Sequence, residues 1–492
     1  MGENDFSLRF PFLIKSKSKL RRDEIIMAET VIKKTAELRT LLKEGQTAEQ
    51  KALAKEGRLC ARDRMALIFD EGTFVEVGAY IGRKRTELDK ETDDSFEPVI
   101  TGYGAVNGTL VYAFSQDFSR LHGALGEMHA KKIVNILAMA NKSGAPVIGV
   151  FDSAGAKILE GVDALAGYAS IMNALESSVS PKIAVVSGIC GGATSVLAEM
   201  CDIVIGAKKT GKLYAALSGK LDDAIAADLS QIDIVCEDDA AAVTKARELI
   251  KYFAGADEMA DDINRTLDIE GILANEKYDI HDIIDATFDA GSFTELGGEK
   301  AKSMVTGLAV LNGNPVVVIA NNPSYKDGFL CTGAAKKAIF ALEIAAIADL
   351  PVVTLVDGNG IGDSKNFEEK GFSRILARLA SEYAKRAYFG KPTVTVTLGL
   401  SYGTAYTVMG AKSLTGGIAL ALDRARISAM HPDSAVAFLD EVKNESKHKE
   451  TAKTWAERYA SPLEAAKSGH IDDIIDSAEL RQRIGAALEM LL

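Results

Sequence analysis

The chain has 492 residues, with 57 Lys or Arg against 69 Asp or Glu, so its formal net charge is −12. An acidic chain of this kind is not expected to bind nucleic acid, and a hydrophobic content of 47% excludes a disordered chain. The five cysteines form no CxxC pair, so the sequence supports neither a zinc ribbon nor a disulfide framework. We therefore expect a cytoplasmic protein.

The N-terminal region is expected to precede the folded domains. Residues 1–26 are basic and contain no long apolar run, so they do not form a secretory signal and are interpreted as an N-terminal extension before Met27. Residues 27–56 are predicted to form a helical preamble. Far downstream, residues 392–411 lack charge, but their Val-Thr alternation predicts a strand and a turn rather than a membrane helix.

An internal repeat organises the rest of the chain. TGYGAVNG (101–108) parallels TGLAVLNG (306–313), and APVIGVFDSAG (145–155) parallels LPVVTLVDGNG (350–360), both 205 residues apart. Upstream, FDEGTFVE (69–76) parallels FDAGSFTE (288–295), with the extra spacing explained by a charged insertion near residues 83–98. We predict two duplicated domains, residues 57–268 and 269–492.

Each predicted domain alternates strands and helices in the same order. Each has a strand (110–115; 316–320), a helix (128–141; 333–347), a buried strand after proline (147–151; 352–356) and a further strand (183–186; 393–398). This alternation predicts an α/β fold with crossover connections.

Small-residue turns follow the last two strands of each half. They are Ser153-Ala154-Gly155-Ala156 and Gly191-Gly192-Ala193, and then Gly358-Asn359-Gly360 and Gly403-Thr404-Ala405. A helix that begins directly after such a turn leaves backbone N–H groups without intrahelical acceptors, and its dipole favours negative charge. Two such turns facing one ligand oxygen would form an oxyanion hole. Close packing of helix on strand is the alternative explanation.

Several long motifs resemble the carboxyltransferase subunits of biotin-dependent acyl-CoA carboxylases and of sodium-pumping acyl-CoA decarboxylases. These are GRLCARDRMALIFDEGTFVE (57–76), GALGEMHAKKI (123–133), DSAGAKILEGVDALAGY (152–168), YDIHDIIDATFDAGSFTEL (278–296), YGTAYTVM (402–409) and RYASPLEAAKSGHIDDIID (458–476). The resemblance covers roughly residues 50–492. It implies two tandem crotonase-like ββα-spiral domains per chain.

The resemblance also implies a division of labour. The N-terminal domain would bind acyl-CoA, and the C-terminal domain would bind biotin carried by another protein, with no metal required. Backbone amides would hold enolates while a carboxyl group moves between carboxybiotin and the α-carbon of a short acyl-CoA. The expected catalytic positions are Gly155, Gly192, Ala193, Gly403, Thr404 and Ala405. Expected binding positions are Ala154, Ala156, Gly191, Gly360, Tyr402 and Thr407.

The implied partners are a biotin carboxyl carrier protein, with either a biotin carboxylase or a membrane decarboxylase subunit. The resemblance further implies a homodimer of active sites, commonly within a hexamer. A carboxylase component and the α-subunit of a sodium-pumping decarboxylase remain alternatives, because the sequence does not separate them.

Some turns depart from the family's usual sequence. The usual S-G-G-A-R is Ser153-Ala154-Gly155-Ala156-Lys157 here, and a usual G-G-A is Gly403-Thr404-Ala405. Thr404 would be strained if the turn required a left-handed residue at that position. A catalytically impaired scaffold is therefore a third alternative. A hydratase or isomerase that works without biotin would need a positioned carboxylate, for which Glu160 and Asp163 are the first-half candidates.

Overall fold

The structure is a computed structural model. It describes Glu37 and residues 48–82, 84, 96–216, 232–255, 261–262, 264–265, 268–362, 371–438 and 445–492. The chain divides into two compact units, Met1–Ala52 and Leu53–Leu492. In the first unit, Glu37 is helical and Ala48 begins helix α2 (Ala48–Lys55). The expected extension at residues 1–26, and most of the expected preamble at 27–56, lie outside the described residues.

The first half of the second unit is built on a mixed sheet with the order β1-β2-β3-β4-β5-β6-β8, and β7 pairs with β5. β1, β2 and β3 are antiparallel, while the strands from β3 onward are parallel. The strands are β1 (Val75–Glu76), β2 (Val99–Val106), β3 (Thr109–Gln116), β4 (Val147–Ser153), β5 (Lys182–Gly191), β6 (Ile203–Ala207), β7 (Lys212–Tyr214) and β8 (Ile234–Cys236).

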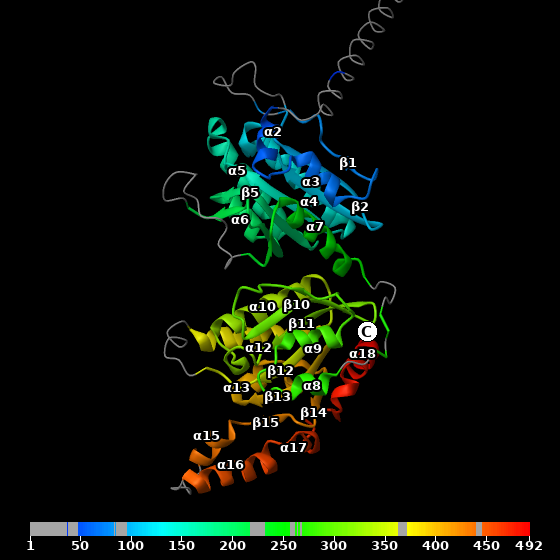
Figure 1. Ribbon diagram of the computed structural model, residues 1–492. Coiled ribbons are helices and arrows are strands. Elements are labelled where there is room, and N and C mark those ends of the chain that lie inside the picture. The colour runs from blue at the N-terminus through cyan, green and yellow to red at the C-terminus, as the bar shows by residue number, and fades with distance from the viewer. Residues whose placement is uncertain are drawn as a thin grey trace, which may run out of the picture. The chain divides into compact units, whose positions relative to one another are not determined.

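Helices cover both faces of this sheet (Figure 1). α4 (Glu127–Ser143) contacts β2, β3 and α5 (Val162–Glu176), while α3 (Ala61–Ile68) and α7 (Asp239–Leu249) contact each other and pack on the sheet. The short helix α6 (Ala193–Glu199) follows β5. The described residues of this half also form the 3₁₀ turns η1 (Leu121–Gly123), η2 (Ile158–Glu160) and η4 (Ile250–Phe253).

The second half repeats this sheet with the order β16-β14-β13-β12-β11-β10-β9, and β15 pairs with β13. Its strands are β9 (Thr294–Glu295), β10 (Met304–Leu311), β11 (Asn314–Asn321), β12 (Val352–Gly358), β13 (Thr393–Tyr402), β14 (Ile418–Leu422), β15 (Arg426–Ser428) and β16 (Asp473–Ile475). The predicted duplication and the α/β class are therefore confirmed.

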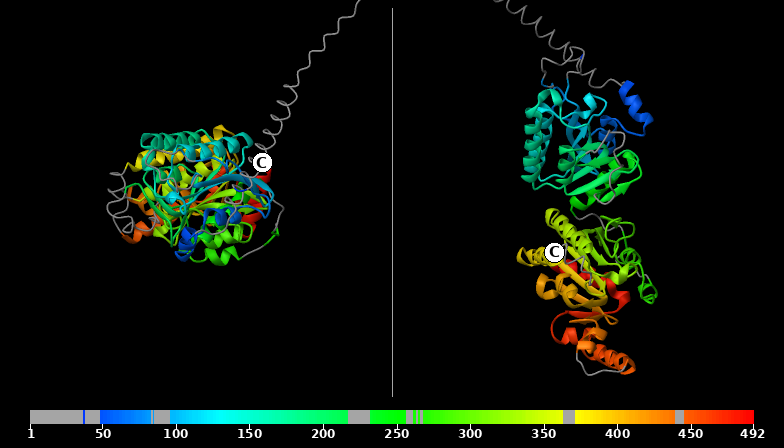
Figure 2. Two further views of the ribbon diagram at one scale, coloured as in Figure 1. Left: turned by 90° about the horizontal axis from the view of Figure 1, so that it is seen from above. Right: turned by 90° about the vertical axis from the view of Figure 1, so that its left-hand side faces the viewer.

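The helices of the second half occupy corresponding places. α10 (Thr332–Ile347) and α12 (Phe372–Tyr388) pack together, and α9 (Ile280–Thr287) and α18 (Leu480–Leu491) contact each other and the sheet. α15 (Pro432–Phe438) and α16 (Glu445–Tyr459) pack side by side beyond β15 (Figure 2). The other elements among the described residues of this half are α8 (Ile269–Leu273), η5 (Lys326–Gly328), α13 (Gly403–Val408), α14 (Lys412–Thr415), α17 (Pro462–Lys467) and η6 (Ser477–Glu479).

Strand register fixes which residues of the two halves correspond. Ser153 pairs with Cys190 where β4 meets β5, and Gly358 pairs with Ser401 where β12 meets β13. Counting on from these pairs, Gly192 corresponds to Gly403. The left-handed backbone of both glycines agrees with this match, because φ is +60° and +58° respectively.

The two halves share one hydrophobic core cluster. Leu249 and Tyr252 from the end of the first half join Met304 and Leu308 of β10 in this cluster. Polar contacts add to it, since Lys300 Nζ lies 2.9 Å from Asp233 Oδ1. The exact boundary predicted at residue 268 stays a prediction, because α8 begins at Ile269 but the preceding residues are only partly described.

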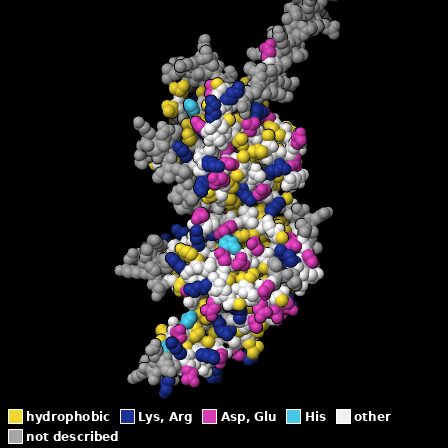
Figure 3. Space-filling model, in the orientation of Figure 1, with side chains coloured by type: hydrophobic (Ala, Val, Ile, Leu, Met, Phe, Trp, Pro, Cys, Tyr) yellow, Lys and Arg dark blue, Asp and Glu magenta, His cyan; other side chains and the backbone are white. Residues whose placement is uncertain are grey.

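Most strands and helices lie where the repeat predicted them. The uncharged stretch at residues 392–411 forms β13 and α13, as expected. Across the described ranges, the helices are too short or too polar to cross a membrane. Most of the charged insertion near residues 83–98 lies outside the described residues. Acidic and basic side chains are interspersed over the face shown in Figure 3.

Candidate active site

The two small-residue turns of the first half meet at one edge of the sheet. β4 and β5 are neighbouring parallel strands, so the residues that come after Ser153 and Gly191 emerge at the same edge. Carboxyl ends of adjacent parallel strands are common ligand sites in α/β folds. The structure therefore brings together the turns that the sequence proposed for the acyl-CoA side.

Two glycines in these turns have backbones that disfavour other residues. Gly155 has φ +113° and Gly192 has φ +60°, a region that L side chains rarely adopt. A Cβ atom built on either residue meets no atom within 4 Å, so both glycines face open space. Close packing therefore does not explain these two glycines, whereas backbone conformation does.

Not every expected donor of the first half is available. The N–H of Gly155 donates to Ser153 Oγ at 3.1 Å, and that of Gly192 donates to the Tyr214 carbonyl at 3.0 Å. Ala193 begins α6, so its N–H has no intrahelical acceptor, and it makes no other hydrogen bond within the described residues. Of the three donors expected in the first half, Ala193 is therefore the one whose N–H is free in this conformation.

The second half presents its amides in the same way. Gly403 adopts the left-handed conformation, while Thr404 and Ala405 lie in the first turn of α13. The concern that Thr404 would be strained is wrong, because the left-handed residue of this turn is the preceding glycine. Gly360, with φ +81°, lies beside Tyr402: an added Cβ would lie 3.9 Å from the Tyr402 carbonyl oxygen.

A cavity of about 670 Å³ opens at the start of α13. Gly403, Thr404 and Thr407 line it from one side, and Arg458 and Tyr459 of α16 line it from another. The Arg458 guanidinium lies 5.2 Å from the centre of the Tyr459 ring. Three of the predicted second-half residues, Gly403, Thr404 and Thr407, thus open onto a space large enough for a small ligand, whereas Gly360, Tyr402 and Ala405 do not line it.

Tyr402 lies behind this turn. Its ring contacts His431 edge-on, with the ring centres 5.5 Å apart, and burial raises the pKa of Tyr402 to about 12. Tyr402 is therefore a neutral phenol at neutral pH. The Thr407 hydroxyl donates to the Thr404 carbonyl at 2.8 Å, which orients that side chain along α13.

The other predicted binding residues have structural roles in this conformation. A Cβ on Gly191 would lie 2.3 Å from the Tyr214 ring, so Gly191 allows that ring to pack on the strand. Ala156 forms an isolated parallel bridge with Leu125, and the N–H of Ala154 donates to the His122 carbonyl at 2.9 Å. These contacts hold the first turn against η1.

The two carboxylates considered for chemistry without biotin are engaged elsewhere. Glu160 is buried, with Oε1 2.8 Å from Lys157 Nζ, and its Oε2 accepts the Glu127 N–H at 2.7 Å at the start of α4. Asp163 is exposed and pairs with Lys84 at 2.6 Å. Neither carboxylate is placed as a free base at the turns, and this arrangement does not favour a hydratase or isomerase.

Sequence reasoning missed a buried charge network behind the first turn. Arg58 and Arg64 both donate to Asp152, the residue before Ser153, and Arg64 also donates to Asp239 at 2.8 Å. The basic residues of GRLCARDR were the available signal, but their acidic partners lie far away in the sequence.

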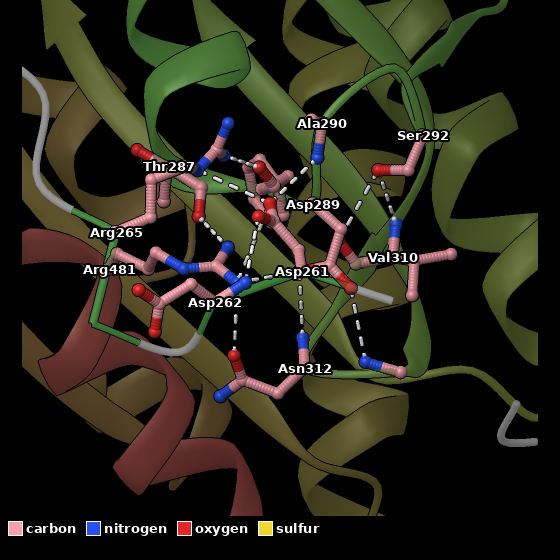
Figure 4. A network of polar contacts seen from close by, with 12 residues as sticks. Asp261, Asp262, Arg265, Thr287, Asp289, Ala290, Ser292, Val310, Asn312 and Arg481 are labelled. Carbon is pink, nitrogen blue, oxygen red and sulfur yellow. Dashed lines mark hydrogen bonds and ion pairs between the residues drawn. The ribbon is translucent and has the colours of Figure 1, made fainter. Parts of the chain in front are cut away.

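Sequence reasoning also missed a second polar network that occurs in both halves. Figure 4 shows it in the second half, where Arg481 of α18 points toward Asp289 and Asn312. Its guanidinium donates to Asp289 Oδ1 at 2.8 Å and to the Thr287 carbonyl at 2.8 Å. Asp261 lies beside it, with Oδ2 3.9 Å from Arg481.

The chain is similar to known proteins over most of its length. The family model described as the carboxyl transferase domain matches residues 53–220 and 223–492. The chain is 33% identical over 471 residues to the methylmalonyl-CoA decarboxylase subunit alpha of Propionigenium modestum, covering 88% of this chain and 90% of that protein. It is 32% identical over 465 residues to the propionyl-CoA carboxylase beta chain of Cereibacter sphaeroides, covering 88% and 91%.

A solved structure is similar over nearly the whole chain. It is that of transcarboxylase 12S, described as a hexamer assembly with methylmalonyl-coenzyme A and methylmalonic acid bound. The two structures superimpose with a TM-score of 0.88 at 28% sequence identity, covering 94% of this chain and 96% of the other.

Proposed function

The chain belongs to the carboxyl transferase family of biotin-dependent acyl-CoA enzymes, and from this premise we propose how its own residues perform the transfer. It moves a carboxyl group between carboxybiotin, presented on a carrier protein, and the α-carbon of a short acyl-CoA. One observation carries this proposal: in each half a helix begins beside a glycine with positive φ, Gly192 or Gly403, and the amides that follow this glycine are unpaired.

In the first half, Ala193 donates its N–H to the thioester oxygen. Negative charge develops on that oxygen when the α-proton leaves, so a fixed donor stabilises the enolate more than the ground state. Gly155 can donate as well only when its N–H leaves Ser153 Oγ, to which it is bound at 3.1 Å. Gly192 sets the direction in which α6 begins.

In the second half, Thr404 and Ala405 donate to the ureido oxygen of biotin, a co-substrate that arrives on another protein. The cavity fits such a ring, because it is about 670 Å³ in volume and has polar groups on one wall and Tyr459 on another. Thr407 also lines this cavity, and the buried Tyr402 supports the turn from behind.

The proposed carboxyl transfer needs no side chain to act as an acid or a base. Cleavage of the nitrogen–carbon bond releases CO₂ and leaves negative charge on the ureido group, where the second-half amides hold it. That group accepts the α-proton of the thioester, and the resulting enolate, held by first-half amides, forms the new carbon–carbon bond to CO₂. The reverse sequence decarboxylates the acyl-CoA.

The same site fits both carboxylation and decarboxylation of the acyl-CoA. Relatives include a carboxylase beta chain and a decarboxylase alpha subunit at almost equal identity. We place the chain in a carboxylase, with the decarboxylase subunit as the alternative. The impaired-scaffold alternative is less favoured, because glycine occupies both left-handed positions, Gly192 and Gly403.

The proposed assembly is based on the relatives. A biotin carboxyl carrier protein delivers biotin, and a biotin carboxylase or a membrane decarboxylase subunit completes the enzyme. The similar transcarboxylase is described as a hexamer, and we propose a hexamer of paired sites here, in the cytoplasm.

The test is an assay of purified protein with methylmalonyl-CoA or malonyl-CoA and free biotin. We expect decarboxylation above the blank, and we expect Gly192→Ala to lower kcat by ~10²-fold or more if α6 no longer aims its amide. Intact CoA binding without any decarboxylation would favour the scaffold instead.

Gly161→Ala is the matched control for Gly192→Ala. Gly161 precedes α5 with φ +55° and ψ −126°, close to φ +60° and ψ −130° at Gly192, and open space surrounds it, so the substitution imposes a similar backbone strain outside the two donor turns. Equal losses of activity in the two variants would mean that strain, rather than the amide, is responsible.

A further inference from the structure

Both halves break strand register at one equivalent position. Between the pairs Phe151–Val186 and Ser153–Cys190, one residue of β4 opposes residues 187–189 of β5. Between Val356–Thr397 and Gly358–Ser401, one residue of β12 opposes residues 398–400 of β13. Such a bulge bends a strand and redirects the residues after it. In both halves those residues lead into a proposed donor helix.

An aspartate occupies the single opposing position in each half. Asp152 Oδ1 accepts the N–H of Ile189 at 3.2 Å, and Asp357 Oδ1 accepts the N–H of Leu400 at 2.8 Å. Each anchored amide lies four residues before the corresponding helix residue, Ala193 or Thr404. Only three residues separate each anchored amide from that helix residue, so a shift at the bulge moves the donors as well.

Glycines make room for both carboxylates. A Cβ on Gly188 would lie 2.1 Å from an Asp152 carboxylate oxygen, and a Cβ on Gly399 would lie 2.3 Å from one of Asp357. The carboxylates are thus packed directly against the bulged backbone.

The two aspartates have different partners. Arg58 and Arg64 donate to Asp152, Arg64 lies 2.8 Å from Asp239, and the Arg58 guanidinium lies 4.2 Å from the centre of the Phe118 ring. These two arginines and two carboxylates balance in charge, and all four side chains are almost fully buried.

Asp357 has a neutral partner instead. The Tyr278 hydroxyl donates to its Oδ2 at 2.9 Å, and among the residues that the structure describes it forms no ion pair with Lys or Arg. Burial raises the pKa of Asp357, while hydrogen bonds from Leu400 and Tyr278 and, least, the charge of Arg424 oppose that shift. The same carboxylate position is therefore held by charge in one half and by a phenol in the other.

We propose that Asp152 and Asp357 are positioning residues that fix the two bulges and thereby aim the donor amides, with Asp152 requiring its charge and Asp357 requiring only its acceptor oxygen. This inference rests on the proposed function for the role of the amides. The bulges themselves are independent of it.

The two positions give a matched experiment. In Asp357→Asn, the amide oxygen still accepts from Leu400, and the amide NH₂ can donate to the Tyr278 hydroxyl. In Asp357→Ala the Leu400 N–H loses its acceptor. In Asp152→Asn, the amide NH₂ faces an arginine and one negative charge is lost beside two buried cations.

We expect Asp357→Asn to keep kcat near that of the parent chain and Asp357→Ala to lower it by ~10–100-fold, the factor that corresponds to one charged hydrogen bond. The KM for the acyl-CoA should stay unchanged in both, because the first-half site is intact. Asp152→Asn should lower both kcat and the unfolding temperature.

Hydrogen–deuterium exchange supplies a readout that needs no catalysis. Peptides covering residues 398–405 should exchange faster in Asp357→Ala than in Asp357→Asn, while residues 393–397 of β13 stay protected and show that the sheet is folded. Unchanged exchange at 398–405 in Asp357→Ala would overturn the inference, as would equal tolerance of asparagine at positions 152 and 357. A parent chain without transferase activity would instead overturn the proposed function.

Discussion

Arg247 and Arg481 make the same three hydrogen bonds in the two halves of the chain. Each guanidinium donates to a carbonyl at the end of a helix, to an aspartate and to the asparagine of an Asn-Gly hairpin turn. In the first half the aspartate is Asp70, and in the second it is Asp289. The arginines come from α7 and α18, which the sequence repeat did not connect.

We expect the two arginines to differ in their contribution to stability. The side chains of Arg481 and Asp289 are only 3% and 7% exposed, against 24% and 28% for Arg247 and Asp70. Arg481→Met leaves a buried carboxylate without its counter-charge and should cost ~3–5 kcal/mol, whereas Arg247→Met should cost much less because its ion pair is more exposed. Urea unfolding measures both, and equal losses would contradict the role of burial.

A histidine replaces an arginine at another equivalent pair of positions. Arg62 Nη1 lies 3.0 Å from Glu76, and His281 Nε2 lies 3.0 Å from Glu295. The hydrogen bond to Glu295 raises the pKa of His281 to about 9, with help from Asp279 and against burial. His281 is therefore charged in the folded chain at neutral pH, as an arginine would be.

Because the second half has a histidine where the first half has an arginine, we expect the stability of the chain to depend on pH. Because the folded pKa of His281 lies above its ordinary value of 6.5, the stabilisation is fully present below pH 6.5 and is lost as pH rises through about 9. His281→Arg should keep the stabilisation at high pH. The gap in unfolding temperature between variant and parent should widen from pH 6 to pH 10, and parallel curves would show that His281 does not titrate in this range.

Gly403→Ala should impair the biotin side selectively. Alanine at φ +58° is strained by ~1–2 kcal/mol, and its Cβ would lie 3.1 Å from the Ala429 carbonyl oxygen. We expect kcat with free biotin to fall while the affinity for acyl-CoA stays unchanged. Gly390→Ala, at φ +64° in open space, is the control for strain alone. Loss of acyl-CoA affinity in Gly403→Ala would contradict the assignment of sides.

Gly191→Ala tests the packing role assigned to that glycine. Its Cβ would overlap the Tyr214 ring at 2.3 Å, which should cost ~1–3 kcal/mol by overpacking. Tyr214→Ala removes the obstacle, so the double variant should lose less stability than the two single variants summed. Additive losses in a thermal-unfolding cycle would show that the ring does not meet the new methyl group.

The architecture could be predicted because the same motifs occur in both halves of the sequence. Matched motifs such as TGYGAVNG and TGLAVLNG placed β2 with β10, and the Asn-Gly pair in each motif forms a hairpin turn with Asn107 or Asn312 at positive φ. Local pattern was sufficient for these elements, because alternation and turn chemistry act over a few residues.

The state of each amide could not be predicted in the same way. Whether Gly155 and Gly192 are free depends on the Ser153 hydroxyl and on the Tyr214 carbonyl, and the latter arrives on β7 from a different part of the chain. The buried partners of Arg64 are likewise 88 and 175 residues away. Contacts of this range arise from packing rather than from spacing.

The shared core between the halves limits how the gene could be divided. η4, which contains Tyr252, contacts β10 and β11, and Tyr252 shares a core cluster with Met304 and Leu308, so either half produced alone would lose part of this core. Each half expressed alone should aggregate rather than fold as an independent enzyme. The two halves should become soluble only when they are expressed together. Duplication has thus given a chain in which neither half has a complete core without the other.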